Sequence, residues 1–212
     1  MDVLYQLGDL TVSRLTEPAE KVSLIALFRE VSREKGWESG SELEGYSESA
    51  IFLALLAGGT LAGGIELRRL DFRSWLPIYG IWPELALTPA TAPAELVVLA
   101  LTPEFRGEPR NLWTLCTEMW RLSRAEGFEH LYMEVPVANY RIYQRLGWSL
   151  KICGPTRQHW GESCYPCLVN VAAVEQAILA KVGSVPSLEF VVNQARRPTG
   201  SSTPSFVTDS CL

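Results

Sequence analysis

The segment Glu95–Leu101, with the sequence ELVVLAL, constrains the fold of this chain more than any other feature. Apolar residues follow one another there almost without interruption, which is typical of a strand that is buried on both faces. A turn carrying Arg106 and Gly107 follows, and Pro109 suits the first turn of a helix. Free N–H groups at such a helix start favour an anion. The sequence therefore predicts a central strand that leads into an anion-binding turn.

The elements around this strand predict the fold class. A helix is expected from Pro18 to Gly36, with apolar residues at Val22, Ile25, Phe28 and Val31 on one face. The other expected elements are a strand at 11–15, a hairpin of 51–56 and 61–67, a helix from Pro109 to Gly127, a strand at 130–135, a helix at 138–146, strands at 148–153 and 165–171, and a helix at 172–182. Helices would then cover both faces of a central mixed β-sheet, so we expect an α/β fold.

Length and charge narrow the class of protein. The 212 residues suit one domain, expected over 1–185, and residues 196–212 have the composition of a disordered tail. A net charge of -5 argues against a nucleic-acid-binding protein. The N-terminus has no signal-peptide pattern, and the uncharged stretch 49–65 is too short to span a bilayer. We expect a cytoplasmic protein with no membrane span and no nucleic-acid partner.

The cysteines near the C-terminal end of the expected domain are candidate metal ligands. Cys153, His159, Cys164 and Cys167 offer four soft ligands, which is enough for tetrahedral zinc. Only Cys164 and Cys167 have knuckle-like spacing, however, and their segment runs into an expected strand. We therefore predict reduced thiols and no metal, and a zinc-stabilised domain is the minor alternative.

Two motifs resemble the GNAT acyltransferase superfamily. One is the Arg106-Gly107 turn at the helix start, and the other is Tyr143 four residues before Gly147-Trp148. The resemblance covers most of residues 10–170 and implies a GNAT-like fold that transfers an acyl group from a thioester to an amine. It also implies donor binding by the central strand and the turn that follows it, at Leu99, Ala100, Leu101, Arg106, Gly107 and Arg110.

The N-terminal half resembles a narrower branch of that superfamily. The acyl-homoserine lactone synthases and long-chain N-acyl amino acid synthases have similar features to Gly36-Trp37, to the acidic segment with Glu42, Glu44, Tyr46 and Glu48, and to the aromatic, proline-rich connection 72–93. This resemblance implies an acyl carrier protein or acyl-CoA as donor and no tightly bound cofactor. Val98 stands where the lactone synthases carry an arginine, so we expect an acceptor other than S-adenosylmethionine.

Within this resemblance, each candidate residue has a role and a simpler alternative. Glu95 is the expected base, Glu66 is a second candidate, and Tyr143 resembles the general acid of the family. The alternatives are a solvent-facing strand-end carboxylate for Glu95 and a core aromatic for Tyr143. The residues expected to contact substrate are Trp37, Glu66, Trp75, Trp82 and His159, with ordinary cover over the sheet as the alternative for the aromatic side chains.

The predicted function is N-acyl transfer to an amine, either an amino acid or a lysine- or ornithine-type side chain of a peptide. Basic residues outnumber acidic ones over 106–157, so we expect a docking face for an acidic carrier protein. That face would consist of Arg106, Arg110, Arg121, Arg124, Arg141 and Arg145. A non-catalytic module that binds an acyl thioester or a protein is the alternative, and a lactone synthase is a minor one.

Overall fold

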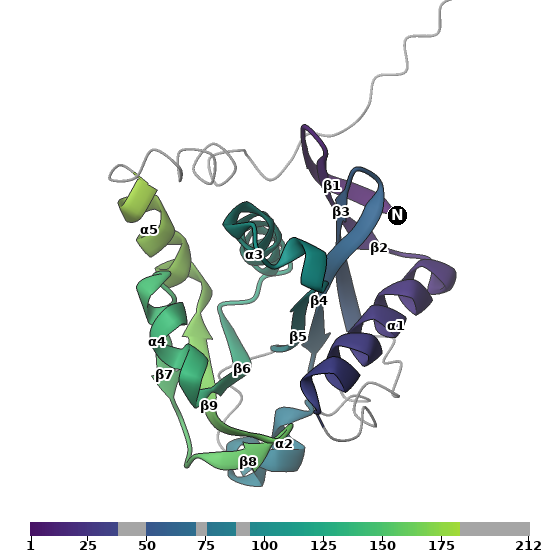
Figure 1. Ribbon diagram of the computed structural model, residues 1–212. Coiled ribbons are helices and arrows are strands. Elements are labelled where there is room, and N and C mark those ends of the chain that lie inside the picture. The colour runs from purple at the N-terminus through teal and green to yellow at the C-terminus, as the bar shows by residue number, and fades with distance from the viewer. Residues whose placement is uncertain (38–49, 71–75, 88–93, 183–212) are drawn as a thin grey trace, which may run out of the picture.

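The computed structural model describes residues 1–37, 50–70, 76–87 and 94–182. Within these ranges, nine strands form one mixed sheet in the order β1-β2-β3-β4-β5-β6-β9-β7, and β8 pairs with β9 (Figure 1). The strands are β1 (Asp2–Leu7), β2 (Leu10–Leu15), β3 (Ala50–Ala57), β4 (Thr60–Arg69), β5 (Ala94–Leu101), β6 (His130–Pro136), β7 (Leu150–Ile152), β8 (Arg157–His159) and β9 (Glu162–Asn170).

The sheet consists of two antiparallel halves joined by a short parallel contact. β1 to β5 pair in sequence order, and β6 pairs with β9. Between the halves, β5 and β6 are paired only at Glu95 with Tyr132 and at Leu96 with Met133. Beyond Leu96 the two strands diverge, and Figure 1 shows the two halves on either side of a helix, α3. The fold therefore opens at its centre.

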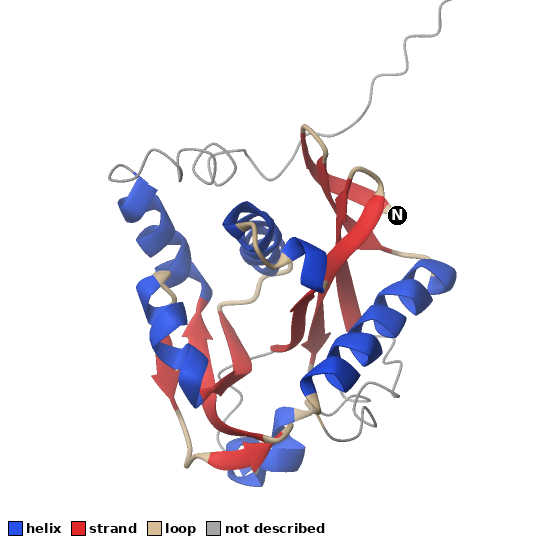
Figure 2. Ribbon diagram, viewed as in Figure 1, coloured by secondary structure: helices blue, strands red, loops and turns tan. Residues whose placement is uncertain are grey.

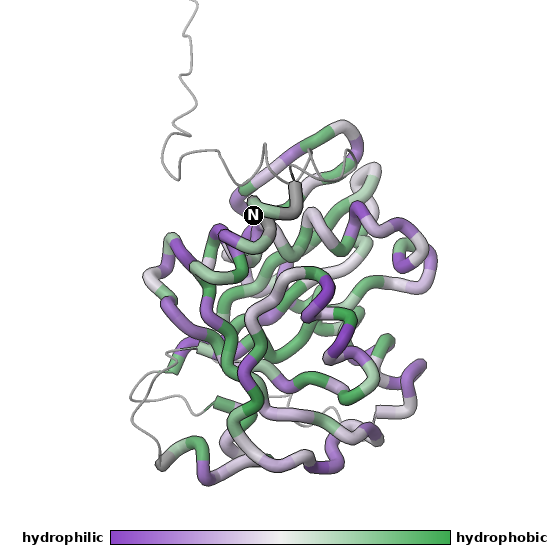
Figure 3. Tube along the Cα trace, turned by 90° about the vertical axis from the view of Figure 1, so that its left-hand side faces the viewer, coloured by the Kyte–Doolittle hydropathy of each residue, from purple (hydrophilic) through white to green (hydrophobic). Residues whose placement is uncertain are grey.

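Helices cover both faces of this sheet (Figure 2). They are α1 (Pro18–Lys35), α2 (Ile78–Ile81), α3 (Pro109–Ala125), α4 (Val137–Arg145) and α5 (Val171–Val182), with short 3-10 turns at Pro83–Leu87 and Pro103–Phe105. α1 packs with Phe52, Val98 and Ala100 on one face, and α3 packs with β2, β3 and β4 on the other. Hydrophobic residues gather along the interior strands (Figure 3).

Gly64 is required where α1 meets the sheet. A Cβ atom at this position would lie 2.4 Å from a methyl carbon of Leu24 and 2.5 Å from the carbonyl oxygen of Leu53. Only glycine leaves room for Leu24 to reach the strand. The hairpin turn before it also needs glycine, because Gly58 and Gly59 both have positive φ angles.

The predicted α/β class and the mixed sheet with helices on both faces are confirmed. Two strands were not predicted: β1 at the sheet edge and the three-residue β8. The apolar face assigned to the first helix was wrong at Val22, which is 60% exposed while Leu24 is buried. The predicted tail at 196–212 lies outside the described residues. None of the described helices is both long enough and apolar enough to cross a membrane.

Candidate active site

A pocket of about 150 Å³ lies where β5 and β6 separate. Val97 begins the separation, because Glu66 pairs with Val98 and Leu67 with Leu96, which leaves Val97 as an extra residue in β5. The pocket is lined by residues of β5, β6, α4, β9, the end of α1 and the β8–β9 turn: Trp37, Leu96, Val97, Val98, Leu99, Met133, Glu134, Pro136, Asn139, Tyr143, Trp160, Glu162 and Cys164. The bulge and the split thus create the cavity together.

The divergence leaves backbone groups of β5 available along one wall of the pocket. β5 stays paired with β4 as far as Leu101, but its pairing with β6 ends at Leu96. In a strand, backbone N–H and C=O groups alternate between its two neighbours, so the groups that face β6 after Leu96 have no ladder partner in that strand. Groups fixed in this way can polarise a carbonyl placed in the split.

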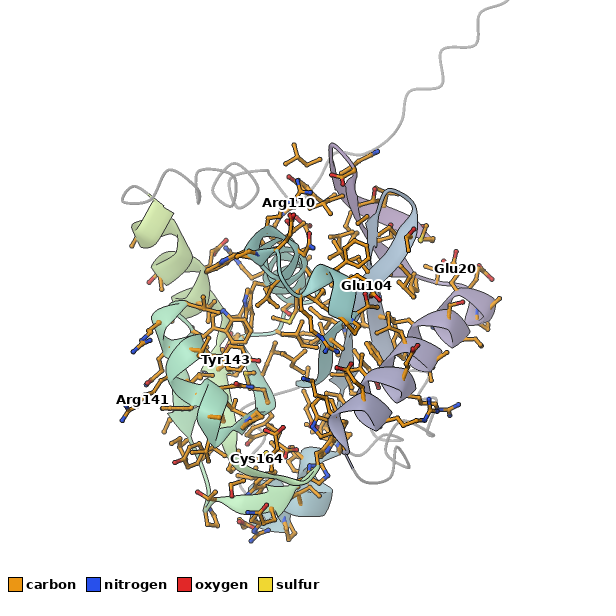
Figure 4. All side chains as sticks on the ribbon, in the orientation of Figure 1. Glu20, Glu104, Arg110, Arg141, Tyr143 and Cys164 are labelled. Atoms are coloured by element: carbon orange, nitrogen blue, oxygen red, sulfur yellow. The ribbon has the colours of Figure 1, made fainter. Side chains whose placement is uncertain are left out.

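Tyr143 reaches the pocket from α4 (Figure 4). Its ring stacks on Trp148, with centroids 4.6 Å apart and an interplanar angle of 8°. Burial, with a smaller contribution from the Cys116 thiol, raises the pKa of Tyr143 to about 12. The phenol is therefore protonated at neutral pH and can donate its proton to an anion in the pocket.

A carboxylate that the sequence analysis did not single out lines the opposite wall. Oε2 of Glu134, in β6, lies 2.6 Å from Nδ1 of His159. The Glu134 side chain is only 19% exposed and the His159 side chain 16%. Cys164 lies beside this pair, and burial, followed by its hydrogen bond to Glu134, raises the pKa of the Cys164 thiol. Glu134 is the one acidic residue in the otherwise apolar segment LYMEV, which is the signal that could have identified it. The pair brings a possible base to the pocket.

Two tryptophans and a second carboxylate complete this wall. Trp37, just after α1, meets Trp160 edge to face with ring centroids 5.0 Å apart, and Trp37 Nε1 donates a hydrogen bond to Glu162 Oε1 at 3.3 Å. Trp160 has a positive φ of 55°, which is unusual for a residue with a side chain. It lies in the tight turn between β8 and β9, whose other member, Gly161, also has a positive φ. This turn directs Trp160 towards Trp37.

Glu95 and Glu66 do not line the pocket: Glu95 is at the paired end of β5, and Glu66 lies in β4 opposite Val98. Glu95 is 3% exposed, and its Oε2 accepts a hydrogen bond from the Ile78 N–H at 3.0 Å. Burial raises the pKa of Glu95 to about 8. Glu66 lies 2.5 Å from Nε of Arg68, and burial raises the pKa of Glu66 although Arg68 opposes that rise. Arg68 pairs across the sheet with Glu95, so the three side chains form one closed cluster.

Solved structures with this architecture are acyltransferases. Neither a protein-family model nor a curated protein matches the sequence. FeeM, an N-acyl amino acid synthase from uncultured soil microbes, superposes with a TM-score of 0.66 at 18% identity, over 79% of this chain and 94% of FeeM. BjaI, a CoA-dependent acyl-homoserine lactone synthase, gives a TM-score of 0.61 at 12% identity, over 87% of this chain and 99% of BjaI. The lactone synthase LasI gives 0.58 at 16% identity, over 76% and 89%.

This chain has the GNAT acyltransferase fold. The resemblance predicted from the sequence is confirmed at that level, including its position near the lactone synthases and N-acyl amino acid synthases. In this GNAT fold the split between β5 and β6 is the central feature, and the pocket described above occupies it.

The turn expected to hold the donor has its arginines engaged. Arg106 donates two hydrogen bonds to the Glu34 carboxylate, at 2.7 and 2.8 Å, and a third to the Leu101 carbonyl oxygen. Arg110 pairs with Glu108 at 2.9 Å and with Asp9 at 3.6 Å. A Cβ atom at Gly107 would meet nothing within 4 Å. Arg106 therefore fastens the turn to α1.

Further members of the expected basic face are paired as well. Arg121 contacts Glu118, and Arg124 contacts Glu175. Arg141 is exposed on α4 and points away from the pocket (Figure 4). Most of the positive charge assigned to this face is therefore balanced within the fold.

The remaining predicted residues are divided between pocket and core. Leu99 lines the pocket, whereas Ala100 and Leu101 are buried beside it. Trp82 is fully buried, and its Nε1 donates to the Pro155 carbonyl oxygen at 2.7 Å, so it braces α2 and does not line the pocket. Residues of the sequence analysis that lie outside the described ranges are Trp75, Glu42, Glu44, Tyr46 and Glu48.

The predicted thiols are free among the described residues. Cys116, Cys153, Cys164 and Cys167 form no disulfide. Within the described part of the chain, no three side chains of histidine, cysteine, aspartate or glutamate converge in a way that would hold a metal ion.

Proposed function

We propose that this protein is an N-acyltransferase that moves a fatty acyl group from a thioester to an amine. One observation carries the proposal: the split of β5 and β6 holds a pocket with a carboxylate–histidine pair on one wall and a protonated tyrosine on another. The fold it shares with N-acyl amino acid synthases and lactone synthases supports the same chemistry.

The walls of the pocket suit the two proton transfers that aminolysis requires. The thioester carbonyl would lie against the unpaired backbone of β5 after Val97, and the amine would approach from the side of Glu134. As the C–N bond forms, the amine proton passes to the Glu134 carboxylate. As the C–S bond breaks, Tyr143 gives its phenolic proton to the leaving thiolate. The products are an amide and a free thiol.

Glu95, the base expected from the sequence, fits this step less well than Glu134. Its carboxyl group accepts the Ile78 N–H and does not line the pocket, and its pKa of about 8 leaves it largely neutral at pH 7. We propose that Glu95 positions α2 and that Glu134 takes the proton.

We propose acyl carrier protein as the preferred donor and acyl-CoA as the second. Pro109 contributes no N–H group at the start of α3, and Arg106 and Arg110 are already paired with carboxylates. The turn therefore offers few ligands for the pyrophosphate of coenzyme A, whereas phosphopantetheine carries one phosphate. The donor segments would be Leu99–Leu101 and the backbone at Gly107. Because such thioesters are intracellular, we place the reaction in the cytoplasm.

Mass spectrometry of the purified full chain tests the proposal. The protein is incubated with acyl-CoA or acyl carrier protein of several chain lengths and with a panel of amines. We expect an amide product that is lost in the Glu134→Gln, Tyr143→Phe double variant. If no combination gives product, the proposal fails. Saturable binding of the acyl thioester without turnover would instead favour a non-catalytic binding module.

A further inference from the structure

The acceptor side of the pocket has a marked excess of negative charge. Its lining includes two carboxylates, Glu134 and Glu162, and no lysine or arginine from the described residues. The two carboxylates come from different strands, β6 and β9, so their convergence results from the fold and not from a local run of acidic sequence.

Three basic side chains of the neighbouring elements have partners elsewhere. Arg157 of β8 contacts the Glu84 carboxylate and the Ile81 carbonyl oxygen. Arg68 of β4 is engaged with Glu66 in the closed cluster. His159 is held by Glu134. None of these described groups is directed at a carboxylate that a bound acceptor would carry.

The aromatic residues of this wall suit a cation. Trp37 and Trp160 meet edge to face beside Glu162, and indole faces attract ammonium groups. Trp37 already donates its N–H to Glu162, which fixes the carboxylate next to the two rings. A carboxylate brought into the same space would instead face two like charges at short range in a partly desolvated site.

We propose that the acceptor is a primary amine with no anionic group near it, such as a diamine or the ω-amino group of a side chain, and not a free amino acid. This inference rests on the proposed function and specifies its substrate class. Glu162, with Trp37 and Trp160, binds the acceptor as an ammonium ion, which loses one proton to solvent before its nitrogen attacks the thioester. Glu134 accepts the second proton, which leaves the nitrogen as the C–N bond forms.

Three acceptors of equal chain length give a direct test: 1,5-diaminopentane, pentylamine and 5-aminopentanoate. They present the same reacting amine and differ only in whether the far end is positive, neutral or negative. We expect kcat/KM to be at least about tenfold lower for 5-aminopentanoate than for either amine without a carboxylate, which corresponds to about 1.4 kcal/mol. Leucinamide and leucine repeat the comparison for an α-amine.

Variants of Glu162 test whether the pocket causes the preference for acceptors without a carboxylate. Glu162→Gln should raise KM for the amine with little change in kcat, and Glu162→Lys should invert the order so that 5-aminopentanoate becomes the better acceptor. Glu129→Gln is the matched control, because Glu129 is an exposed carboxylate just before β6 and does not line the pocket. Circular dichroism and the melting temperature establish that each variant is folded.

The outcomes separate this inference from the proposed function. Absence of product with every amine would refute the proposed function itself. Product formed equally well from 5-aminopentanoate and pentylamine, or from leucine and leucinamide, would refute the cationic-acceptor inference and leave acyl transfer intact. An unchanged preference in Glu162→Lys would also refute it.

Discussion

Two pairs of glutamates lie near β5 and differ in their contacts and in their access to the pocket, although Glu134 of the second pair lies close enough to Glu95 of the first to contribute to the raised pKa of Glu95. Glu95 is at the paired end of β5 and Glu66 lies beside it in β4, opposite Val98; Arg68 and the Ile78 N–H contact their carboxyl groups, and almost no solvent reaches them. Glu134 and Glu162 are beside the split, where both line the pocket. We call these the closed and the open cluster.

The difference follows from backbone pairing and not from residue type. In the closed cluster, β5 still pairs with β6 at Glu95 and with β4 at Glu66, so the space beside the carboxylates is filled by the sheet, by Arg68 and by α2. In the open cluster the strands have separated, and a cavity of about 150 Å³ replaces the missing contacts. A carboxylate in the first setting affects stability, whereas one in the second can meet a substrate. Substitutions in and around the two clusters test this contrast.

The largest effect is expected from Arg68→Met. It removes the cation from the closed cluster, so the buried Glu66 carboxyl must either lie uncompensated or take up a proton, which should lower the free energy of unfolding by up to about 3–5 kcal/mol at pH 7.5. Arg124→Met is the control, because its pair with Glu175 is exposed and should contribute less than about 1 kcal/mol. Urea unfolding measures both. Equal losses in the two variants would show that the closed cluster is not buried as described.

Glu95→Gln should change how stability depends on pH. The folded state raises the pKa of Glu95 from 4.5 to about 8, so it binds this proton more tightly than the unfolded chain does. The contribution of Glu95 to wild-type stability is therefore fully present below pH 4.5, falls as the pH rises towards 8, and is constant above that. The variant lacks this loss and should be more stable than wild type at pH 9, by on the order of 2–4 kcal/mol.

Thermal unfolding between pH 4 and pH 9 checks this prediction. Parallel stability curves for wild type and Glu95→Gln would mean that Glu95 has an ordinary pKa and is open to solvent. The closed cluster would then no longer differ from the open one.

Tyr143→Phe should lower kcat by about 100-fold, because it removes the proton donor for the leaving thiolate. The ring is retained against Trp148, so the melting temperature should hardly change. Tyr140→Phe is the control on the same helix, since Tyr140 does not line the pocket and its hydroxyl contacts the Leu150 carbonyl oxygen. Similar rates for Tyr143→Phe and Tyr140→Phe would show that the Tyr143 hydroxyl takes no part in the reaction.

The smallest effect is expected from Arg106→Gln. The Arg106 guanidinium forms a partly exposed ion pair with Glu34. Loss of this pair should lower the free energy of unfolding by less than about 1 kcal/mol. The KM for the acyl donor should stay within about threefold, equivalent to about 0.7 kcal/mol. A much larger rise in KM would mean that Arg106 leaves Glu34 to bind the donor.

Local patterns explain what the sequence could predict. The apolar run of β5, the helix start at Pro109 and the position of Tyr143 before Gly147 each depend on neighbouring residues, and each lies where expected. The order of the predicted strands and helices along the chain was therefore sufficient to predict the fold class. The missed elements were β1, β8 and the short helix α2 within the expected connection 72–93; β8 was missed because three residues are too few to show a strand period.

The active-site carboxylates depended on contacts between distant segments. Glu134 and His159 are 25 residues apart, and nothing near either residue in the sequence indicates that they pair. The bulge at Val97 arises from the register against β4 and has no local signal. The sequence identified Glu95 as a strand-end carboxylate. The burial of its carboxyl group, however, depends on a contact with α2, which lies in an earlier segment of the chain.

Single-turnover acyl transfer by Glu134→Gln and Glu95→Gln, measured side by side with one donor and one amine, tests the distinction most directly. We predict that Glu134→Gln is at least about 100-fold slower than wild type and that Glu95→Gln stays within about threefold. The reverse order, with Glu95→Gln slow and Glu134→Gln near wild type, would contradict the account and place the chemistry in the closed cluster.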